Sequence, residues 1–318
     1  MTLIGFRSFV LLLAATPALA CMNQYSAPNY DYKAIERSES VSRRIFENHF
    51  DEDWSDRADR LRAELDRSGD FRVKNDLAVA LAHAGQAAKA VIFLEEIERE
   101  KPGLYVTAAN LGTAYELVGN NGKALEWIRQ GIKRNTDSHN GSEWLHVRIL
   151  EAKLALDRNP HWLAEHSILG FAEDMHPDSI EIRGNRGEKL KLDRIKDALI
   201  YQLHERVQFV DRPDPVVGSL LYDLGRLIAG ESLGLGGAKD VFVEARSYLD
   251  GLEGMDSLRD TLDRLIRGAT YALTEGPLPT ERKLITYTEI GLWLFIIVYV
   301  LKNLLARLMK KPSIDPEL

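Results

Sequence analysis

The stretch FRVKNDLAVALAHAGQAAKAVIFLEEIEREKPGL, residues 71–104, is followed directly by YVTAANLGTAYELVGNNGKALEWIRQGIKRNTDS, residues 105–138. The two segments align without a gap at a constant offset of 34 residues. Apolar, small and glycine positions coincide, so the two segments are expected to adopt the same structure. The aligned pairs are Phe71/Tyr105, Leu77/Leu111, Ala78/Gly112, Leu81/Tyr115, Gly85/Gly119, Ala90/Ala124 and Leu94/Ile128.

The pattern within each segment indicates two antiparallel helices joined by a short turn. Small residues recur as the pairs Ala78/Gly112 and Ala90/Ala124, where the two helix backbones must approach closely. Larger apolar residues surround them. An aligned glycine follows the first helix of each segment and can adopt the left-handed conformation that ends a helix. One such hairpin cannot bury its apolar face alone, so consecutive hairpins are expected to stack.

This part of the chain resembles the tetratricopeptide repeat (TPR) family, whose unit has the same length. Pro102 matches the proline that closes a unit, while Thr136 departs from it at the same place. Lys74 and Ala108 stand where the family has an aromatic residue or Leu. The resemblance implies an all-α fold, a TPR-type solenoid of helical hairpins with degenerate repeats toward the C-terminus. It also implies a binding scaffold, without identifying the partner.

In the TPR family the inner surface of the solenoid is lined mainly by the first helices of the units, and protein or peptide partners bind there. The resemblance therefore implies a partner-binding groove. The Lys, Asn and Arg set with which some members grip a terminal carboxylate is not reproduced, so recognition of a free C-terminus is not expected. The groove positions are Arg72, Asn75, Val79 and His83 in the first repeat, and Val106, Ala109, Thr113 and Glu116 in the second.

The composition excludes several classes of protein. The chain has 318 residues, 45% hydrophobic and 28% charged, which is ordinary for one or two globular domains. The formal net charge of -7 argues against a general nucleic-acid binder. Cys21 is the single cysteine, so no intramolecular disulfide can form.

Residues 1–20 have the pattern of an export signal. Arg7 precedes an apolar run, and the small-residue sequence Ala18-Leu19-Ala20 forms a cleavage site. Cys21, directly after that site, resembles the bacterial lipoprotein signal, in which the cysteine is lipid-modified. The alternative is that Cys21 is simply the first residue of a mature exported protein.

A polar tether, residues 21–52, connects the signal to a helical-repeat domain, residues 53–275. The repeat signature decays after residue 138. Proline, glycine and an alternating Ser-Ile-Glu-Ile sequence then interrupt the helical pattern, which predicts a loop with a brief extended piece. The predicted elements are helices over 42–50 and 53–68, degenerate units 139–172 and 216–252, an insertion over 170–191, and helices over 193–210 and 256–273.

An apolar stretch near the C-terminus, residues 284–305, is expected to be a single transmembrane helix after a linker, residues 276–283. More positive charge follows this stretch than precedes it, which places the tail, residues 306–318, in the cytoplasm. The body would then face the periplasm of a bacterial cell. The alternative is a hydrophobic helix that lies in the membrane interface or packs on a partner.

The sequence contains no catalytic constellation. The histidines between His139 and His176 lack the i, i+3 or i, i+4 spacing of a helical metal site, so no metal is expected. No nucleophile elbow is present, and Cys21 stands at a terminus. The Gly-rich residues 230–237 lack the Gly-Lys-Ser/Thr ending of a phosphate-binding loop. We therefore expect neither enzymatic activity nor a cofactor.

The leading hypothesis is a membrane-anchored, exported TPR adaptor that mediates protein–protein interaction in the cell envelope. The alternative is a small-ligand receptor or enzyme whose site is formed by residues 161–191, with His161, His166 and His176. A third hypothesis makes the C-terminal span the partner-binding element and the helical domain a spacer.

Overall fold

The computed structural model describes residues 22–26, 40–46, 53–172, 175, 179–230 and 234–274. Over these residues the secondary structure is helical, apart from turns and an isolated antiparallel bridge between Arg183 and Lys189. This confirms the all-α class. The helices are α2 (Val41–Phe46), α3 (Trp54–Ser68), α4 (Phe71–His83), α5 (Ala87–Glu100), α6 (Tyr105–Leu117), α7 (Asn121–Arg134), α8 (Ser138–Gly141), α9 (Glu143–Leu156), α10 (Trp162–Glu165), α11 (Leu192–Arg206), α12 (Pro215–Ala229), α13 (Leu235–Tyr248) and α14 (Asp256–Thr274).

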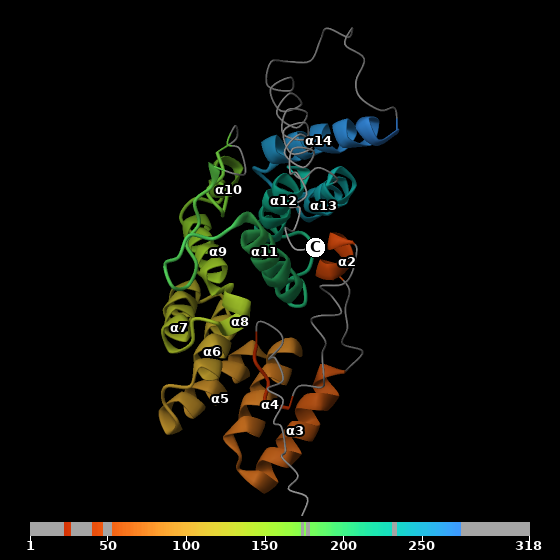
Figure 1. Ribbon diagram of the computed structural model, residues 1–318. Helices are drawn as coiled ribbons and strands as arrows, with labels where there is room; N and C mark the ends of the chain where they lie inside the picture. The colour runs from red at the N-terminus through yellow and green to blue at the C-terminus, as the bar shows by residue number, and fades with distance from the viewer. Residues whose placement is uncertain are drawn as a thin grey trace, which may run out of the picture.

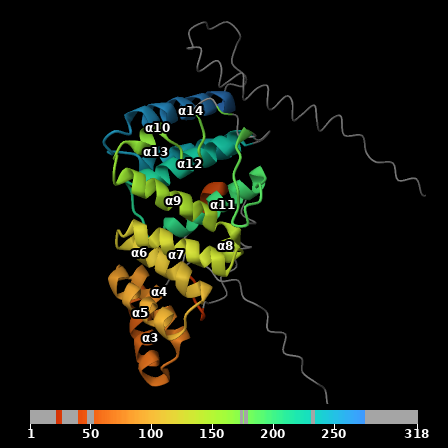
Figure 2. The same cartoon turned by 90° about the vertical axis from the view of Figure 1, so that its left-hand side faces the viewer.

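The helices form an elongated stack that follows chain order. Helix α3 lies at one end and α14 at the other, with each successive helix from α3 to α7 packed on the one before it (Figures 1 and 2). Helix α7 packs on α9, and α11 to α14 continue the stack in the same sequential way. Helix α2 breaks this order, because it lies beside α11 and α13 although it precedes α3 in the chain (Figure 1).

The hairpins α4/α5 and α6/α7 occupy the two aligned segments. Gly85 and Gly119 follow their first helices with φ values of 74° and 79°, the left-handed conformation predicted from the alignment. A Cβ atom on Gly112 would lie 2.3 Å from Cδ1 of Ile128 on α7, so a side chain at position 112 would force Ile128 to shift. The small residue at position 112 therefore lies where the two helices approach closely, as the spacing predicts.

Two hydrophobic cores divide the stack. The first joins α3 to α7, with Leu77 and Leu111 fully buried, and the second joins α9 to α14, with Leu199 and Leu224 fully buried. Helix α9 contributes to both, since Leu150 belongs to the first core while its other buried apolar side chains belong to the second. We call α3 to α7 the N-terminal half and α11 to α14 the C-terminal half.

The hairpin α12/α13 repeats the close approach seen in α6/α7. A Cβ atom on Gly225 would lie 2.3 Å from the ring of Phe242, and one on Gly218 would lie 2.5 Å from Leu249. Proline at the first position of α12 and the Asp214 side chain, which accepts a hydrogen bond from the Val217 N–H, define where this helix begins. The degenerate unit predicted over 216–252 is thus a helical hairpin.

The described residues of the region predicted as an insertion, 170–172, 175 and 179–191, have the irregular structure expected of them. Helix α10 has four residues and is followed by extended chain, and the bridge between Arg183 and Lys189 closes a tight turn. No helix within the described residues has the length and apolarity needed to cross a membrane. The predicted signal, Cys21 and the predicted span over 284–305 lie outside those residues.

Candidate functional site

The eight groove positions implied by the TPR resemblance are mostly covered by other parts of the chain. The side chain of Arg72 remains exposed, and His83 is half-buried. The other six positions are less than 10% exposed. The buried positions are Asn75, Val79, Val106, Ala109, Thr113 and Glu116.

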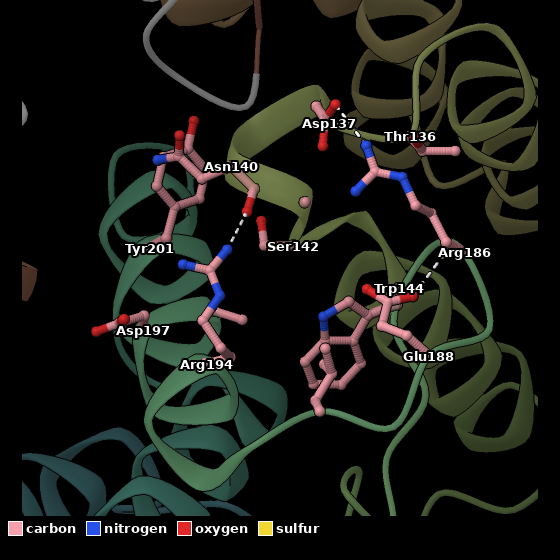
Figure 3. Close-up of a pocket in the computed structure, with 13 residues that line it drawn as sticks. Thr136, Asp137, Asn140, Ser142, Trp144, Arg186, Glu188, Arg194, Asp197 and Tyr201 are labelled. Carbon is pink, nitrogen blue, oxygen red and sulfur yellow. Dashed lines mark hydrogen bonds and ion pairs between the residues drawn. The ribbon is translucent and has the colours of Figure 1, made fainter.

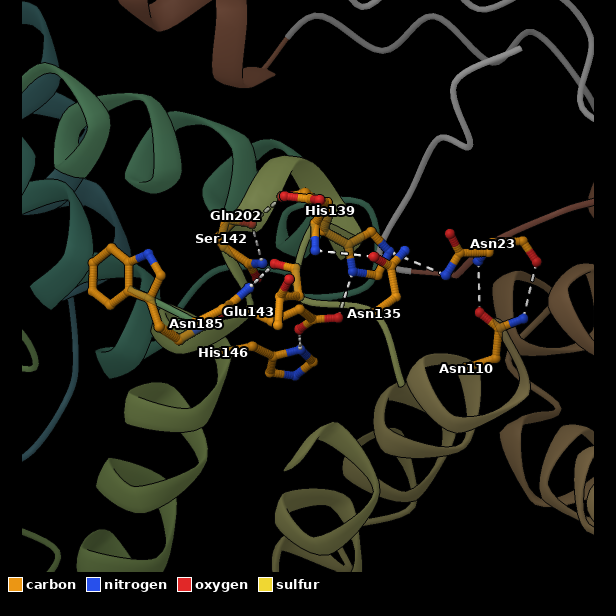
Figure 4. Close-up of polar contacts among 12 residues, drawn as sticks. Asn23, Asn110, Asn135, His139, Ser142, Glu143, His146, Asn185 and Gln202 are labelled. Carbon is orange, nitrogen blue, oxygen red and sulfur yellow. Dashed lines mark hydrogen bonds and ion pairs between the residues drawn. The ribbon is translucent and has the colours of Figure 1, made fainter. Parts of the chain in front are cut away.

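The N-terminal segment, which we define as residues 22–26, covers part of α4 and α6. The Asn23 N–H donates a hydrogen bond of 2.6 Å to Oδ1 of Asn110, and Nδ2 of Asn110 donates one of 2.9 Å back to the Asn23 carbonyl (Figure 4). The same carbonyl accepts a hydrogen bond of 2.8 Å from Nδ2 of Asn75. A hydrogen bond of 2.9 Å from Asn110 to Asn75 fixes the two amides relative to each other. Both backbone groups of Asn23 are therefore satisfied by side chains of the two repeats.

Asp76 holds the end of the same segment. Its carboxylate accepts hydrogen bonds from the N–H groups of Tyr25 and Ser26, each 2.7 Å long, and from the Ser26 hydroxyl at 2.5 Å. We call Asn75, Asp76 and Asn110 the seat of the N-terminal segment. All three are at most 1% exposed, and a buried polar group left without a partner costs about 1–3 kcal/mol. The seat is therefore stable only when an occupant supplies its hydrogen-bond partners.

Two further contacts complete the attachment of the N-terminal segment. Met22 is fully buried in the first core, and Gln24 accepts a hydrogen bond of 2.7 Å from the guanidinium of Arg57 on α3. The ring of Tyr25 packs edge-on against Phe71, with centroids 5.7 Å apart. The segment is thus anchored by an apolar side chain at one end and by Asp76 at the other.

Glu116, another predicted groove residue, lies in a buried charge cluster rather than on an open surface. Its carboxylate binds Nη1 of Arg206 at 2.7 Å, Nε2 of His146 at 2.8 Å and Nζ of Lys153 at 2.9 Å. Burial opposes ionisation, but the charge of Arg206 and the bond from His146 hold the pKa of Glu116 well below its usual range. The cluster connects α6 of the N-terminal half to α11 of the C-terminal half.

The cluster continues to the N-terminal segment. Glu143, fully buried, lies 3.3 Å from Nδ1 of His146 and 2.6 Å from Nδ1 of His139. Burial would raise the pKa of Glu143, but these two histidines lower it to about 2. Burial likewise opposes charge on His146, while hydrogen bonds to Glu116 and Glu143 raise its pKa. Nε2 of His139 lies 3.3 Å from the side-chain amide of Asn23, so one polar network extends from the seat to α11 (Figure 4).

His83 has an aromatic environment. Its ring stacks between Trp54 and Phe209, with centroid distances of 4.0 Å and 4.2 Å. Burial, together with the nearby charge of Arg57, lowers the pKa of His83 to about 3. This predicted groove residue therefore packs α3 and the chain that follows α11 against α4.

A polar pocket of about 360 Å³ lies where the insertion meets α8 and α11 (Figure 3). Arg186 pairs with Asp137 at 2.6 Å on one side, and Arg194 donates to the Asn140 carbonyl at 3.2 Å on the other. Asn140 and its neighbour His139 have positive φ, a conformation that is uncommon outside glycine. The remaining lining residues are Thr136, Gly141, Ser142, Trp144, Glu188, Leu190, Asp197, Ala198 and Tyr201.

The histidines predicted for a site in the insertion do not line this pocket. His166 is exposed and stacks on Trp162, and His161 lies beside Gly254, while His176 is outside the described residues. Within the described part of the chain, no three His, Cys, Asp or Glu side chains are grouped to hold a metal ion. His161 and His166 are therefore separate from the pocket.

No protein-family model matches the chain, and comparisons with curated proteins and with solved structures return no match.

Sequence reasoning missed two members of the seat by one helical position. It selected Asn75 and its aligned partner Ala109, whereas Asp76 and its aligned partner Asn110 make most of the hydrogen bonds. The signal was present, because a polar residue stands directly before the aligned leucines Leu77 and Leu111 in both repeats. A buried polar residue at a repeated helix position indicates a partner outside the helix.

Proposed function

We propose that this chain is an exported, membrane-anchored scaffold of the TPR type that binds another protein of the cell envelope without catalysing a reaction. Two helical hairpins at a 34-residue offset support the TPR assignment. The contact of Gly112 with Ile128 supports it further, because the helices approach at the small-residue position typical of the repeat. The contact of Gly225 with Phe242 extends the same packing to α12/α13.

The hydrogen bonds between Asn110 and the main chain of Asn23 carry the proposed binding mode. A side-chain amide that satisfies both the N–H and the C=O of one residue recognises extended polypeptide by its backbone. This mode of recognition is independent of side chains and suits a scaffold for protein segments. The proposed partner is therefore a protein that offers an extended segment.

The proposed anchor is the C-terminal stretch over residues 284–305, with the tail in the cytoplasm and the helical body in a bacterial periplasm. The export signal and the excess of positive charge after the stretch support the same orientation. Lipid modification of Cys21 would add a second anchor at the other end of the tether.

Photo-cross-linking in cells tests this function. A photoreactive residue is placed at Arg72, which is exposed on α4 one turn before Asn75, and a matched control is placed at Lys89, exposed on α5. We expect a specific protein adduct at position 72 and none at position 89. The absence of an adduct at position 72, or equal adducts at both positions, would contradict the proposal.

Deleting residues 284–318 locates the recognition element. An adduct at position 72 that survives release from the membrane assigns recognition to the helical domain. An adduct that disappears while the domain stays folded favours the third hypothesis, in which the membrane segment binds the partner.

The second candidate function, a small-ligand receptor or enzyme, is favoured by one observation, the polar pocket beside Arg186 and Arg194. Native mass spectrometry of the full chain tests it. A low-mass ligand that co-purifies with the protein and is lost in Arg194→Ala would support this function. If the protein carries no ligand after incubation with a cell extract that contains the natural metabolites, this function is contradicted.

A further inference from the structure

The seat is a site whose hydrogen bonds are directed at a polypeptide backbone. Asn110, Asn75 and Asp76 engage the N–H and C=O of Asn23 and the N–H groups of Tyr25 and Ser26. Every residue except proline carries these groups. A different extended segment could therefore form the same bonds, provided that it has no proline at the three bonded positions.

Side chains of the N-terminal segment add three requirements. Met22 is fully buried in the first core, the buried Gln24 side chain accepts a hydrogen bond from Arg57, and the hydroxyl of Ser26 bonds to Asp76. Tyr25 and Ser26 are otherwise exposed, and the buried Asn23 side chain lies against His139. The occupant is thus defined as an apolar residue, a residue other than proline, a hydrogen-bond acceptor such as Gln, a second residue other than proline, and then Ser or Thr.

We propose that residues 22–26 are a replaceable ligand of the seat, and that an extended peptide with this pattern, supplied by another protein, binds in the same register after displacing them. This inference rests on the proposed scaffold function and adds its regulation and its ligand class. The seat buries three polar side chains, so it exchanges one occupant for another rather than standing empty.

The attachment of the segment to the same chain sets the threshold for exchange. A ligand that belongs to the same chain acts at an effective concentration set by the length of chain that joins it to the site. An external peptide binds in the seat only when its concentration or affinity exceeds that of the attached segment. The chain therefore discriminates against weak peptides and responds to a partner that is held nearby.

The test uses full-length protein in mild detergent and a fluorescent peptide of sequence Met-Asn-Gln-Tyr-Ser, which corresponds to residues 22–26. The protein variant Asn23→Pro/Tyr25→Pro removes two of the N–H donors to the seat and so releases the attached segment. We expect this variant to bind the peptide at least tenfold more tightly than the unmodified protein in fluorescence anisotropy.

Matched peptides show whether the seat binds the peptide through its backbone. Alanine at the position of Asn23 keeps both backbone groups and is expected to change the affinity less than threefold. Proline at that position lacks the N–H and is expected to weaken binding at least tenfold. Alanine at the position of Ser26 removes the hydroxyl that bonds to Asp76 and should weaken binding severalfold.

Three outcomes would overturn the proposal. A folded proline variant that fails to bind the peptide makes the segment a permanent part of the core. Equal binding by the variant and the unmodified protein shows that the segment does not compete. Equal binding of the alanine and proline peptides shows that the backbone is not recognised.

Hydrogen exchange on the unmodified protein keeps the proposal testable should the proline variant not fold. We expect the N–H groups of Asn23, Tyr25 and Ser26 to exchange at least 100-fold faster than those of Leu77 and Leu111, because the segment opens while α4 and α6 stay folded. Exchange at the same rate as these core amides would contradict a replaceable segment. Such a result would leave partner cross-linking at Arg72 unaffected, so it would refute the exchange without refuting the scaffold function.

Discussion

The two halves of the molecule are each covered by a different part of the N-terminal tether, and the contacts differ in kind. In the N-terminal half, residues 22–26 are held mainly through backbone hydrogen bonds to the seat. In the C-terminal half, helix α2 is held through side chains, since Ile45 is fully buried and the ring of Phe46 stacks on Tyr248 at 6.2 Å. A backbone-directed contact tolerates a change of sequence, and a packed side chain does not.

This difference separates the roles of the two attachments. Nδ1 of His204 donates a hydrogen bond of 3.1 Å to the Ile45 carbonyl, and Arg44 pairs with Asp197 at 4.0 Å. Apolar packing and the Arg212 guanidinium over Phe46 add to the α2 contact. A foreign segment would have to reproduce that shape. We therefore expect residues 22–26 to be exchanged for another peptide in the N-terminal half, while α2 stays bound to the C-terminal half.

The largest effect is expected where the two halves meet. Glu116→Ala removes the carboxylate that pairs with Arg206, which is 8% exposed, at 2.7 Å, and losing one partner of a buried ion pair costs about 3–5 kcal/mol. The free energy of unfolding from urea titration measures this loss. The control Glu151→Ala removes the exposed pair with Arg129 and should cost about 0–1 kcal/mol. Similar losses in both variants would show that the cluster does not join the halves.

The comparison of attachments predicts unequal alanine effects. Ile45→Ala empties a fully buried position and should destabilise the protein by about 2–5 kcal/mol. Asn23→Ala retains the N–H and C=O that bind Asn110 and Asn75, and should cost about 1 kcal/mol or less. Thermal unfolding followed by circular dichroism distinguishes them. A larger loss at Asn23 than at Ile45 would reverse the assignment of the fixed and replaceable attachments.

Acid should destabilise the N-terminal half through His83. Its pKa in the folded protein, about 3, is below the ordinary value of 6.5. The stabilisation from the neutral ring is therefore complete above pH 6.5 and is lost as the pH falls toward 3. At pH 4 the difference approaches about 3 kcal/mol, since one pKa unit corresponds to about 1.4 kcal/mol. His83→Phe keeps the aromatic stack and removes the proton, so its stability relative to the unmodified protein should rise as the pH is lowered. A constant difference between pH 7 and pH 4 would contradict this.

Acid should act in the opposite direction in the C-terminal half through Asp223. Its carboxylate is fully buried and accepts a hydrogen bond of 2.7 Å from Ser167. Burial raises its pKa to about 6 from 3.8, although Ser167, Arg226 and the Leu169 N–H oppose the change. The protonated group therefore stabilises the fold below pH 3.8, and this stabilisation is lost as the pH rises through 6.

Asp223→Asn tests that sign. The amide needs no ionisation, so the variant should be more stable than the unmodified protein by up to about 3 kcal/mol at pH 7.5, and the gain should vanish near pH 4. Urea unfolding at both pH values measures it. A variant that is less stable at pH 7.5 would show that the charge of Asp223 is needed to hold the segment around Ser167.

The repeated helices and their contacts could be predicted from sequence because they depend on local periodicity. The left-handed Gly85 and Gly119, and the approach of Gly112 to Ile128, follow directly from the aligned small residues. The helices α11 and α14 likewise follow from apolar residues at three- and four-residue spacing. Each of these features is encoded within about one helical turn or one hairpin.

The covering of the first helices could not be predicted in the same way. The Asn23 backbone bonds to Asn110, 87 residues away, and a backbone donor or acceptor leaves no pattern in the sequence. Glu116 looked like a groove residue because its partner Arg206 is 90 residues distant. The one local signal was the recurrence of a polar residue at Asp76 and Asn110, which indicates burial against something outside the repeat.

The smallest expected effects compare the two hairpins directly. Gly112→Ala places a methyl group against Ile128, and Gly225→Ala places one against Phe242. Each should destabilise its half by about 1–3 kcal/mol, because both helix pairs are closely packed at these positions. The control Gly122→Ala, on α7, meets its nearest atom at 4.0 Å and should stabilise by about 0.5–1 kcal/mol through helix propensity. Equal losses at 112 and 225 would support one packing rule for both halves. If Gly225→Ala does not lower stability, the C-terminal hairpin does not require a small residue at this contact. The likeness between the halves would then be limited to their helical topology.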